Sequence, residues 1–456
     1  MIYSINPATE EQIQTFTAHT PAEVEQALAH VAAAQKQWAQ RSVAERTPLL
    51  RQVAKLLRER KAEYGALITL EMGKPVNEAE GEIEKCAWNC EFYADKAAEY
   101  LGDEVVPSSA TLSKVVYDPL GVVLAVMPWN YPFWQVMRFA APALAAGNGV
   151  VLKHANNVPQ CALAIAQLFR DAGAPEGLFV TLLVEASEVK SLIEDRRISA
   201  VTLTGSTPVG KLVASQAGAV LKKQVLELGG SDAFIVLADA DIELAAKSAV
   251  KARFQNVGQS CISAKRFIVV EAVADQFTQR FCHYTAELKV GNPMQRDVTI
   301  GPLARANLRD DLHDQVQRSV AQGAKLLMGG RFVEGPGFFY EPTVLGDVTS
   351  EMAAGCEETF GPAAAIMRVK DTEAAIALAN SLDYGLGAGL WTQNVAEGAV
   401  LARRIEAGAV FINGLVASDP RYPFGGIKQS GYGRELGVHG AREFTNIKTV
   451  WIGPAK

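Results

Sequence analysis

Cysteine is scarce in this sequence, and the few cysteines are scattered. The six among 456 residues do not form the closely spaced pattern of a small disulfide-bonded secreted domain. Cys86 and Cys90 stand four residues apart, but no second pair follows that would complete a zinc site. The six histidines also share no metal-ligand spacing. We therefore expect reduced thiols, no bound metal and a cytoplasmic protein.

The sequence also lacks a basic excess, a long apolar run and a recognisable leader. Lys and Arg number 44 against 50 Asp and Glu, a net charge of -6, so we expect no nucleic-acid partner. No apolar run is long enough to cross a bilayer, and the first residues show no cationic stretch followed by an apolar one. What is present is a 49% hydrophobic composition, enough for a large core in more than one domain.

The order of apolar segments predicts a helical start followed by two α/β units. Residues 1–100 carry helix signals, including the capping-box patterns Thr20-Pro21-Ala22-Glu23 and Ser42-Val43-Ala44-Glu45. From residue 121 to 228, short apolar runs alternate with helical segments, which indicates a doubly wound parallel sheet. A second series begins near Asp232. Ligands of such sheets bind beyond the carboxyl ends of the strands, where this sequence has Pro128-Trp129-Asn130, Lys153, Gly205-Ser206-Thr207 and Gly229-Gly230.

Cys261 is the candidate nucleophile. It follows the small polar run Gly258-Gln259-Ser260, which suits a backbone that a ligand approaches closely. A reactive cysteine needs an accessible thiolate in a polar setting, whereas a cysteine buried for packing has apolar neighbours and is inert. For a single cysteine, packing in the core is the commoner role, so the residues alone leave both interpretations open.

Three other strand ends carry side chains with possible chemistry. Glu227, before Leu228-Gly229-Gly230, could be a general base with a pKa raised by burial, or a capping or ion-paired residue. Asn130 could donate to an oxyanion, or simply shape a turn. The segment Gly205-Ser206-Thr207-Pro208-Val209-Gly210 opens a helix whose N-terminus favours phosphate. It lacks the middle glycine of the usual dinucleotide fingerprint, so a plain strand-to-helix turn is an equal interpretation.

Seven segments together resemble the aldehyde dehydrogenase superfamily, in the family's order and over nearly the whole chain. They are Glu71-Met72-Gly73-Lys74-Pro75, Pro128-Trp129-Asn130-Tyr131-Pro132, Thr204-Gly205-Ser206-Thr207, Leu226-Glu227-Leu228-Gly229-Gly230, Gly258-Gln259-Ser260-Cys261, Glu358-Thr359-Phe360-Gly361-Pro362 and Pro423-Phe424-Gly425-Gly426. The resemblance implies an α/β fold with a doubly wound, Rossmann-type cofactor domain (1–111 and 127–230). It also implies an α/β catalytic domain (231–430) and a small β bridging element (112–126 and 440–456).

The resemblance also implies an activity and a role for each candidate residue. The family oxidises an aldehyde to a carboxylic acid with NADP or NAD. Cys261 would attack the aldehyde, Asn130 and the Cys261 N–H would stabilise the oxyanion, and Glu227 would activate water to hydrolyse the thioester. The cofactor contacts it implies are Trp129, Lys153, Asn156, Gly205, Ser206, Leu228, Glu358 and Phe360.

After Lys153 the chain departs from the family pattern. Relatives usually continue with proline, a small residue and often a glutamate that binds the adenosine ribose, whereas this chain has His154-Ala155-Asn156. A carboxylate would repel a 2′-phosphate, Asn156 does not, and Lys153 could attract it. We predict that NADP is accepted alongside NAD and can be the preferred cofactor.

The substrate prediction depends on two polar residues. Arg138 and Ser418 stand where succinate-semialdehyde dehydrogenases of this family contact the substrate carboxylate, so we expect succinate semialdehyde. An ordinary surface ion pair of Arg138 is an equal interpretation. Gln255 replaces a second arginine that some members have, which weakens the assignment. Ser263 replaces a second cysteine, so we predict no disulfide switch with Cys261.

Three alternatives stay open at this point: another aliphatic or semialdehyde substrate, a CoA-acylating relative, and a catalytically silent member. Glu227 argues for hydrolysis rather than transfer to CoA. The intact Cys261, Glu227 and Asn130 argue against a silent member. By resemblance, Leu112–Tyr117 and Thr445–Ile452 bridge subunits, so we expect a homodimer or homotetramer, with edge strands paired across the boundary.

Overall fold

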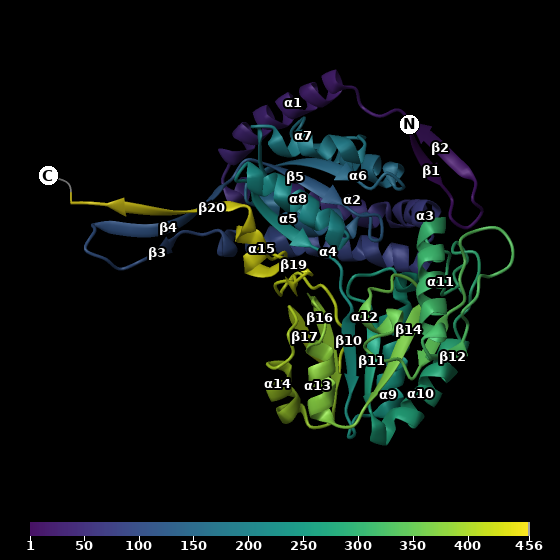
Figure 1. Cartoon of the computed structure of the whole chain (residues 1–456). Helices are drawn as coiled ribbons and strands as arrows, with labels where there is room; N and C mark the ends of the chain where they lie inside the picture. The colour runs from purple at the N-terminus through teal and green to yellow at the C-terminus, as the bar shows by residue number, and fades with distance from the viewer. Residues whose placement is uncertain (455–456) are drawn as a thin grey trace.

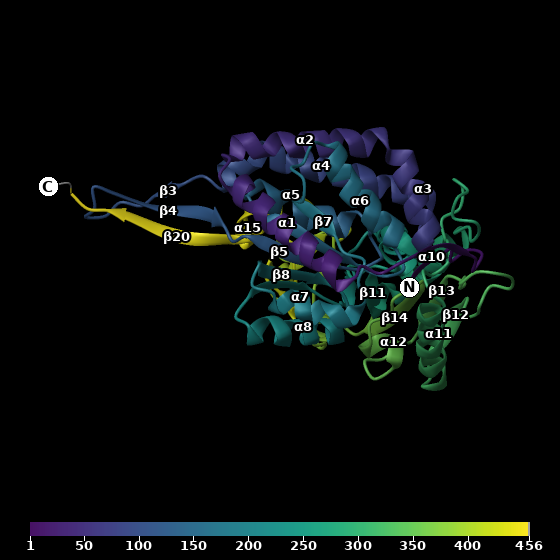
Figure 2. The ribbon, with the colours of Figure 1, turned by 90° about the horizontal axis from the view of Figure 1, so that it is seen from above.

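Three larger β-sheets and the helices around them make up residues 1–454, the part of the chain that this computed structural model describes (Figure 1). A six-stranded sheet forms one unit and a seven-stranded sheet the other. A three-stranded sheet projects to one side of both units, as Figures 1 and 2 agree. Within these residues no helix is both long and apolar enough to cross a membrane.

The six-stranded sheet has the order β19-β9-β8-β5-β6-β7. Its strands are β5 (Val122–Met127), β6 (Gly149–His154), β7 (Phe179–Thr181), β8 (Ile198–Thr204), β9 (Lys223–Glu227) and β19 (Gly431–Tyr432). The first five are parallel and β19 is antiparallel. After β7 the chain crosses back and places β8 beside β5, so the strand order reverses between them. Such a reversal opens a ligand crevice at the carboxyl ends of the strands.

Helices cover both faces of this sheet. They are α1 (Pro21–Ala39), α2 (Val43–Glu59), α3 (Lys61–Met72), α4 (Val76–Tyr100), α5 (Trp134–Ala145), α6 (Pro159–Asp171), α7 (Val189–Glu194), which follows the short η1 (Ala186–Glu188), and α8 (Thr207–Ala219). Val123 and Ala125 of β5 join the core under α2–α6, whereas Val122 and Leu124 join the core under α7 and α8. Both faces of the strand are buried, which explains its unbroken apolar run.

The helical start is confirmed in part. Both predicted capping boxes are present, with Thr20 and Ser42 as N-caps of α1 and α2. The prediction is wrong for the first residues, because β1 (Ile2–Ile5) and β2 (Gln12–Phe16) form an antiparallel hairpin. Alternate residues of β1 are buried, the two-residue period of a strand. That short pattern lies before the first helix signal.

The second unit has a seven-stranded sheet in the order β12-β13-β14-β11-β10-β16-β17. Its strands are β10 (Asp232–Val236), β11 (Ala264–Val270), β12 (Lys325–Met328), β13 (Thr343–Gly346), β14 (Ala363–Val369), β16 (Gly387–Trp391) and β17 (Ala409–Ile412). The helices around it are α9 (Ile242–Phe254), η2 (Gln255–Gly258), α10 (Glu271–Ala286), α11 (Ala306–Ala321), α12 (Ala353–Cys356), α13 (Thr372–Asn380) and α14 (Val395–Ala402). Short strands β15 (Tyr384–Gly385) and β18 (Ile427–Lys428) pair with each other.

The projecting sheet consists of β3 (Glu104–Val105), β4 (Leu112–Pro119) and β20 (Thr445–Ile452), and α15 (Gly437–Glu443) precedes it. β20 pairs with β4 along eight residues, as the two predicted bridging segments require. The predicted bridging segment 112–126 extends too far, because its last residues, 122–126, belong to β5, which pairs with β6 and β8 of the six-stranded sheet. The division into cofactor, catalytic and bridging domains stays a prediction.

Candidate active site

The segment before Cys261 has an unusual backbone. Asn256, Val257 and Gly258 have φ angles of 54°, 57° and 71°, a left-handed region that costs a non-glycine residue on the order of 1–3 kcal/mol. A side chain on Gly258 would collide with the carbonyl oxygen of Gly361. At this position the sequence interpretation needs correcting, because the glycine is required by a neighbouring loop rather than by an approaching ligand. The strained turn fixes the start of the Cys261 segment.

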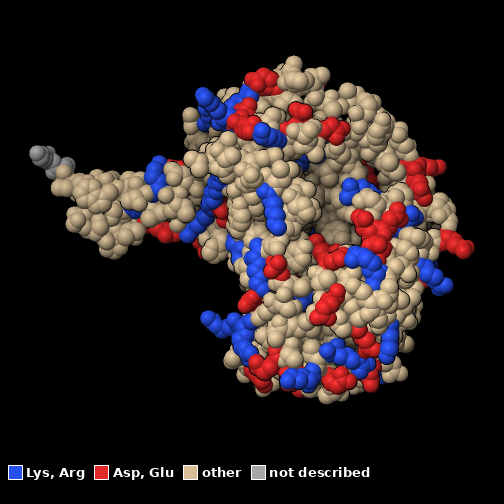
Figure 3. Space-filling model, in the orientation of Figure 1, with Lys and Arg blue, Asp and Glu red and all other residues tan. Residues whose placement is uncertain are grey.

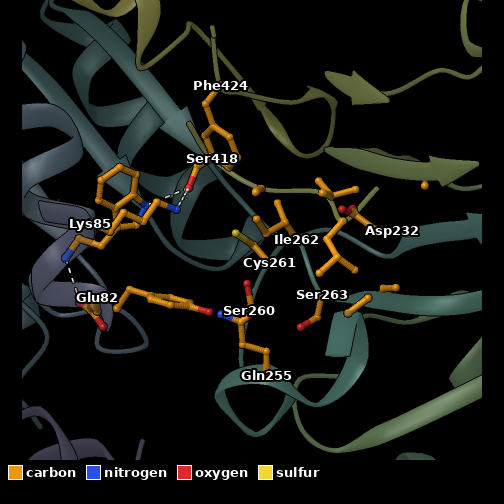
Figure 4. Close-up of a pocket in the computed structure, with 18 of the residues that line it drawn as sticks. Glu82, Lys85, Asp232, Gln255, Ser260, Cys261, Ile262, Ser263, Ser418 and Phe424 are labelled. Atoms are coloured by element: carbon orange, nitrogen blue, oxygen red, sulfur yellow. Dashed lines mark hydrogen bonds between the residues drawn. The ribbon is translucent and has the colours of Figure 1, made fainter. Parts of the chain in front are cut away.

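Cys261 lies on the wall of a cavity of about 290 Å³ (Figure 4). The lining comes from both units and includes Lys85, Trp134, Arg138, Ser263, Ser418 and Phe424. Of the predicted site residues, Arg138 and Ser418 therefore share the cavity with Cys261. Asn130 and Glu227 are not part of the described lining.

The Cys261 thiol is poorly solvated. Burial raises the pKa of the thiol to about 11, although the nearby cations Arg138 and Lys265 lower it. Lys265 is fully buried, and its Nζ donates to the carbonyl oxygens of Ser260, at 2.8 Å, and Cys261, at 2.6 Å. The thiolate that attacks a carbonyl therefore has to form by proton transfer within the site.

Asn130 is held next to the Cys261 segment by its amide. Its Nδ2 donates to the backbone carbonyl oxygen of Gln259 at 3.1 Å, and the backbone carbonyl oxygen of Asn130 accepts from Asn256 Nδ2 at 2.9 Å. An amide nitrogen has two hydrogens, so one remains for an oxyanion after the bond to Gln259. Asn130 is 5% exposed, which keeps this donor away from bulk water.

Glu227, at the end of β9, is almost fully buried. Neither of its carboxylate oxygens has a hydrogen-bond partner among the described residues. Burial raises the pKa of this carboxyl well above its usual value, Arg138 opposes the increase, and Glu435 adds to it. A buried, unpaired carboxyl of this kind is typical of a general base. Its charge also contributes to the raised pKa of Cys261, so the two groups are neighbours.

Arg138 forms a buried ion pair with Glu435, and each side chain is 2% exposed. It also donates to Thr204 Oγ1 at 3.3 Å and lies 4.5 Å from the ring centre of Phe424. The alternative of a surface ion pair does not describe it, because it is fully enclosed. As a substrate contact Arg138 stays a prediction.

Glu358 contacts Gly230 and Lys265, and Phe360 contacts Trp129. Glu358 Oε1 accepts from the Gly230 N–H at 2.9 Å and is 3.7 Å from Lys265 Nζ. The Phe360 ring meets Trp129 edge to face, with centroids 5.8 Å apart. Glu358 and Phe360 also line a second cavity. Figure 3 shows a hollow between the two units on the face it presents, with charged side chains around its rim.

Lys153 and Asn156, at the carboxyl end of β6, are bonded to each other. Lys153 Nζ donates to Asn156 Oδ1 at 2.8 Å, and Asn156 Nδ2 donates to Glu185 Oε2 at 2.8 Å. The surroundings of Lys153 and Asn156 are therefore not free of carboxylates, because Glu185 reaches Asn156 from a distant segment. Glu185 raises the pKa of Lys153, but burial has the larger effect and lowers it.

The predicted turn from strand to helix is present, and phosphate binding at it stays a prediction. Ser206 is the N-cap residue of α8, and its side chain makes no capping hydrogen bond there. One turn on, Val209 and Leu212 are 46% and 58% exposed, an apolar surface beside a helix N-terminus that suits a nucleotide. Gly210 has no side chain because Leu228 occupies that space. Gly205 donates its N–H to the Glu227 carbonyl oxygen at 3.0 Å, which connects the turn to the end of β9.

The sequence analysis missed four charged residues of the site: Lys85, Glu185, Lys265 and Glu435. Lys265 carried a usable signal, because Lys265 and Arg266 open a strand that is otherwise apolar, and buried cations need partners. The others contact partners far away in the chain, for example Lys85 with Ser418, and no local pattern indicates such a contact.

Comparison with known proteins agrees with this geometry. A family profile described as "Aldehyde dehydrogenase family" matches residues 1–450. A probable succinate-semialdehyde dehydrogenase (NADP(+)) of Synechocystis sp. is 54% identical over 99% of both chains. A succinate semialdehyde dehydrogenase (NAD(P)+) of Escherichia coli is 50% identical, over 98% of this chain and 97% of that one. A solved succinic semialdehyde dehydrogenase of Streptococcus pyogenes, in complex with NADP+, has a TM-score of 0.97, 38% identity and full coverage of both chains. The predicted fold class is confirmed.

Proposed function

The chain belongs to the aldehyde dehydrogenase family, and from that premise we propose that it oxidises succinate semialdehyde to succinate with NADP or NAD. The observation that carries the proposal is the arrangement around Cys261. A partly accessible thiol shares a cavity with cationic side chains. The buried Glu227 carboxyl, which has no hydrogen-bond partner among the described residues, lies close by. Relatives named as succinate-semialdehyde dehydrogenases, at about half identity, support the substrate.

The first half of the reaction depends on Cys261 and Asn130. The thiolate forms a C–S bond to the aldehyde carbon, and the carbonyl electron pair moves onto oxygen. That oxyanion accepts hydrogen bonds from Asn130 Nδ2 and the Cys261 N–H. When the oxyanion collapses, the aldehyde C–H bond breaks and leaves a thioester on Cys261. NADP or NAD, when bound, supplies the acceptor for the departing hydride.

The second half depends on Glu227. Its carboxylate removes a proton from water as the water oxygen attacks the thioester carbon, the C–S bond breaks, and the acid and the Cys261 thiolate are released. A carboxyl with a raised pKa accepts this proton more readily than an ordinary glutamate does. This step separates hydrolysis from transfer of the acyl group to CoA.

The residues around the α8 N-terminus fit a dinucleotide. Ser206 and the first N–H groups of α8 would hold phosphate, and Val209 and Leu212 offer an apolar surface to a base. Glu358 would accept a hydrogen bond from a ribose hydroxyl, and Trp129 and Phe360 would lie beside the cofactor. The exposed hydrophobic pair on α8, beside the helix N-terminus, supports the assignment of this surface to the cofactor. We propose that Lys153 and Asn156 accept a 2′-phosphate, so that both NADP and NAD bind.

Arg138 and Ser418 are proposed contacts of the substrate carboxylate, because both line the cavity that holds Cys261. We also propose a homodimer or a dimer of dimers in the cytoplasm. β20 is the edge of the projecting sheet and exposes Ile447, Trp451 and Ile452, which a subunit partner would cover. Sedimentation of the purified protein as a monomer would contradict the assembly.

One assay tests the function. Purified protein is mixed with NADP or NAD and a panel of aldehydes, with and without CoA, and the reduced cofactor is followed by absorbance. We expect turnover that is fastest with succinate semialdehyde and does not depend on CoA. Absolute dependence on CoA would favour an acylating enzyme, and no turnover of any aldehyde would favour a silent family member.

A further inference from the structure

The charged groups on the wall of the Cys261 cavity differ in how they are paired. Glu82 is paired with Lys74, and Arg138 with Glu435. Among the described residues, no carboxylate lies within salt-bridge distance, 4.0 Å, of Lys85 Nζ. Lys85, on α4, is therefore the cation on this wall that has no carboxylate in salt-bridge contact, although Glu82 and Asp419 act on it from farther away.

Lys85 is held in place by neutral groups. Its Nζ lies 4.2 Å from the ring centre of Trp134 and donates to Ser418 Oγ at 2.8 Å. Figure 4 shows this bond, with Lys85 and Ser418 side by side and the Cys261 sulfur turned toward them. A cation over an indole ring is attracted to it, but the ring does not neutralise its charge.

The Ser418 hydroxyl can still donate one hydrogen bond. Its Oγ accepts from Lys85 Nζ and, at 3.0 Å, from Trp134 Nε1. A hydroxyl has two acceptor lone pairs and one hydrogen, so these two bonds use both lone pairs and the O–H must donate elsewhere. Ser418 is 5% exposed, which leaves the cavity as the place for an acceptor.

We propose that Lys85 Nζ and the Ser418 hydroxyl bind the carboxylate of the substrate and so make the enzyme prefer acid aldehydes over neutral ones. The proposal rests on the proposed function and names the residue that sets its substrate class. Two donors converge on one point of the cavity, and a carboxylate has two oxygens to accept from them. Arg138 contributes less, because Glu435 already balances its charge, and Gln255, also on the lining, is neutral.

The state of Lys85 agrees with this role. Burial, and to a smaller extent Arg138, lower the pKa of Lys85 to about 8. At neutral pH the side chain is therefore still mostly protonated. A bound carboxylate would restore the interaction that burial removes, and would favour the charged form further.

The test compares an acid aldehyde with a neutral one of the same length. Wild type, Lys85→Met and Lys85→Arg are assayed with succinate semialdehyde and with butanal at neutral pH. We expect Lys85→Met to lower the ratio of the two kcat/KM values by about 10- to 100-fold, the range of a charge-assisted hydrogen bond. Lys85→Arg should keep more of that selectivity. The matched control is Lys96→Met, which removes an exposed lysine of the same helix whose salt bridge, in the described part of the chain, is with Glu99.

Calorimetric measurement of succinate binding tests the contact between Lys85 and a carboxylate independently of catalysis. We expect the wild type and Lys96→Met to bind succinate and Lys85→Met to bind it at least about tenfold more weakly. A selectivity ratio and a succinate affinity that Lys85→Met leaves unchanged would overturn the proposal. If the wild type binds succinate through Lys85 but oxidises no aldehyde, the proposed function fails and the carboxylate site stands.

Discussion

The charged residues around Cys261 and those around Lys153 differ in their exposure to solvent. Around Cys261, the carboxyl of Glu227 is 1% exposed and Lys265 is fully buried, so water screens their charges very little. Around Lys153, half-buried Asn156 bonds to the exposed side chain of Glu185. An electrostatic interaction grows as the local dielectric falls and shrinks when solvent and salt screen it. The buried end should therefore decide whether the reaction occurs, and the exposed end should adjust which cofactor is used.

Replacing the nucleophile should have the largest effect. Cys261→Ala removes the sulfur that we propose forms the thioester, so we expect kcat to fall by more than about a thousandfold, as for other covalent catalysts. Cofactor binding, followed by calorimetry, should stay close to wild type, because the α8 turn is untouched. Cys282→Ala, at a half-buried thiol far from the cavity lining, is the matched control. Substantial activity of Cys261→Ala would show that another group is the nucleophile.

Raising the pH should remove the preference for acid aldehydes. The pKa of Lys85 is lowered to about 8, first by burial and then by Arg138, while Cys86, Glu82 and Asp419 raise it. The charged form binds carboxylate and is present below this pKa. The ratio of kcat/KM for succinate semialdehyde over butanal should therefore be level below about pH 8 and fall above it.

Cys261 and Glu227 act on both aldehydes, so the effect of their ionisation on kcat/KM cancels in the ratio of the two kcat/KM values. In Lys85→Met the ratio should not change with pH. A wild-type ratio that rises above pH 8 would contradict the assignment of Lys85.

The smallest effect is expected at the exposed end. Glu185→Gln removes a negative charge beside Asn156, so we expect the ratio of kcat/KM for NADP over NAD to rise by about 3- to 10-fold, and less at high salt. Glu188→Gln removes a charge from the same segment without touching Asn156 and serves as the control. An equal change in both variants would mean that only the general charge of this surface matters.

Sequence reasoning found the residues that local patterns indicate. Glu227 and Asn130 follow the rule that places ligands beyond the carboxyl ends of parallel strands, and Cys261, just before β11, follows a small polar run. It did not find Glu435, Lys85 or Glu185, because their contacts join segments far apart in the chain: Arg138 with Glu435, Ser418 with Lys85, and Asn156 with Glu185. Which distant side chains meet is set by the packing of the two units, and no local spacing records it.

The central claim is that Cys261 carries an acyl group that Glu227 releases. Glu227→Gln, mixed with NADP and succinate semialdehyde and then quenched, tests it by peptide mass spectrometry. We expect one rapid equivalent of reduced cofactor and a succinyl thioester on the Cys261 peptide, followed by turnover about 10²- to 10⁴-fold slower than wild type. Wild-type turnover in this variant, or an acyl group on any other residue, would contradict the account.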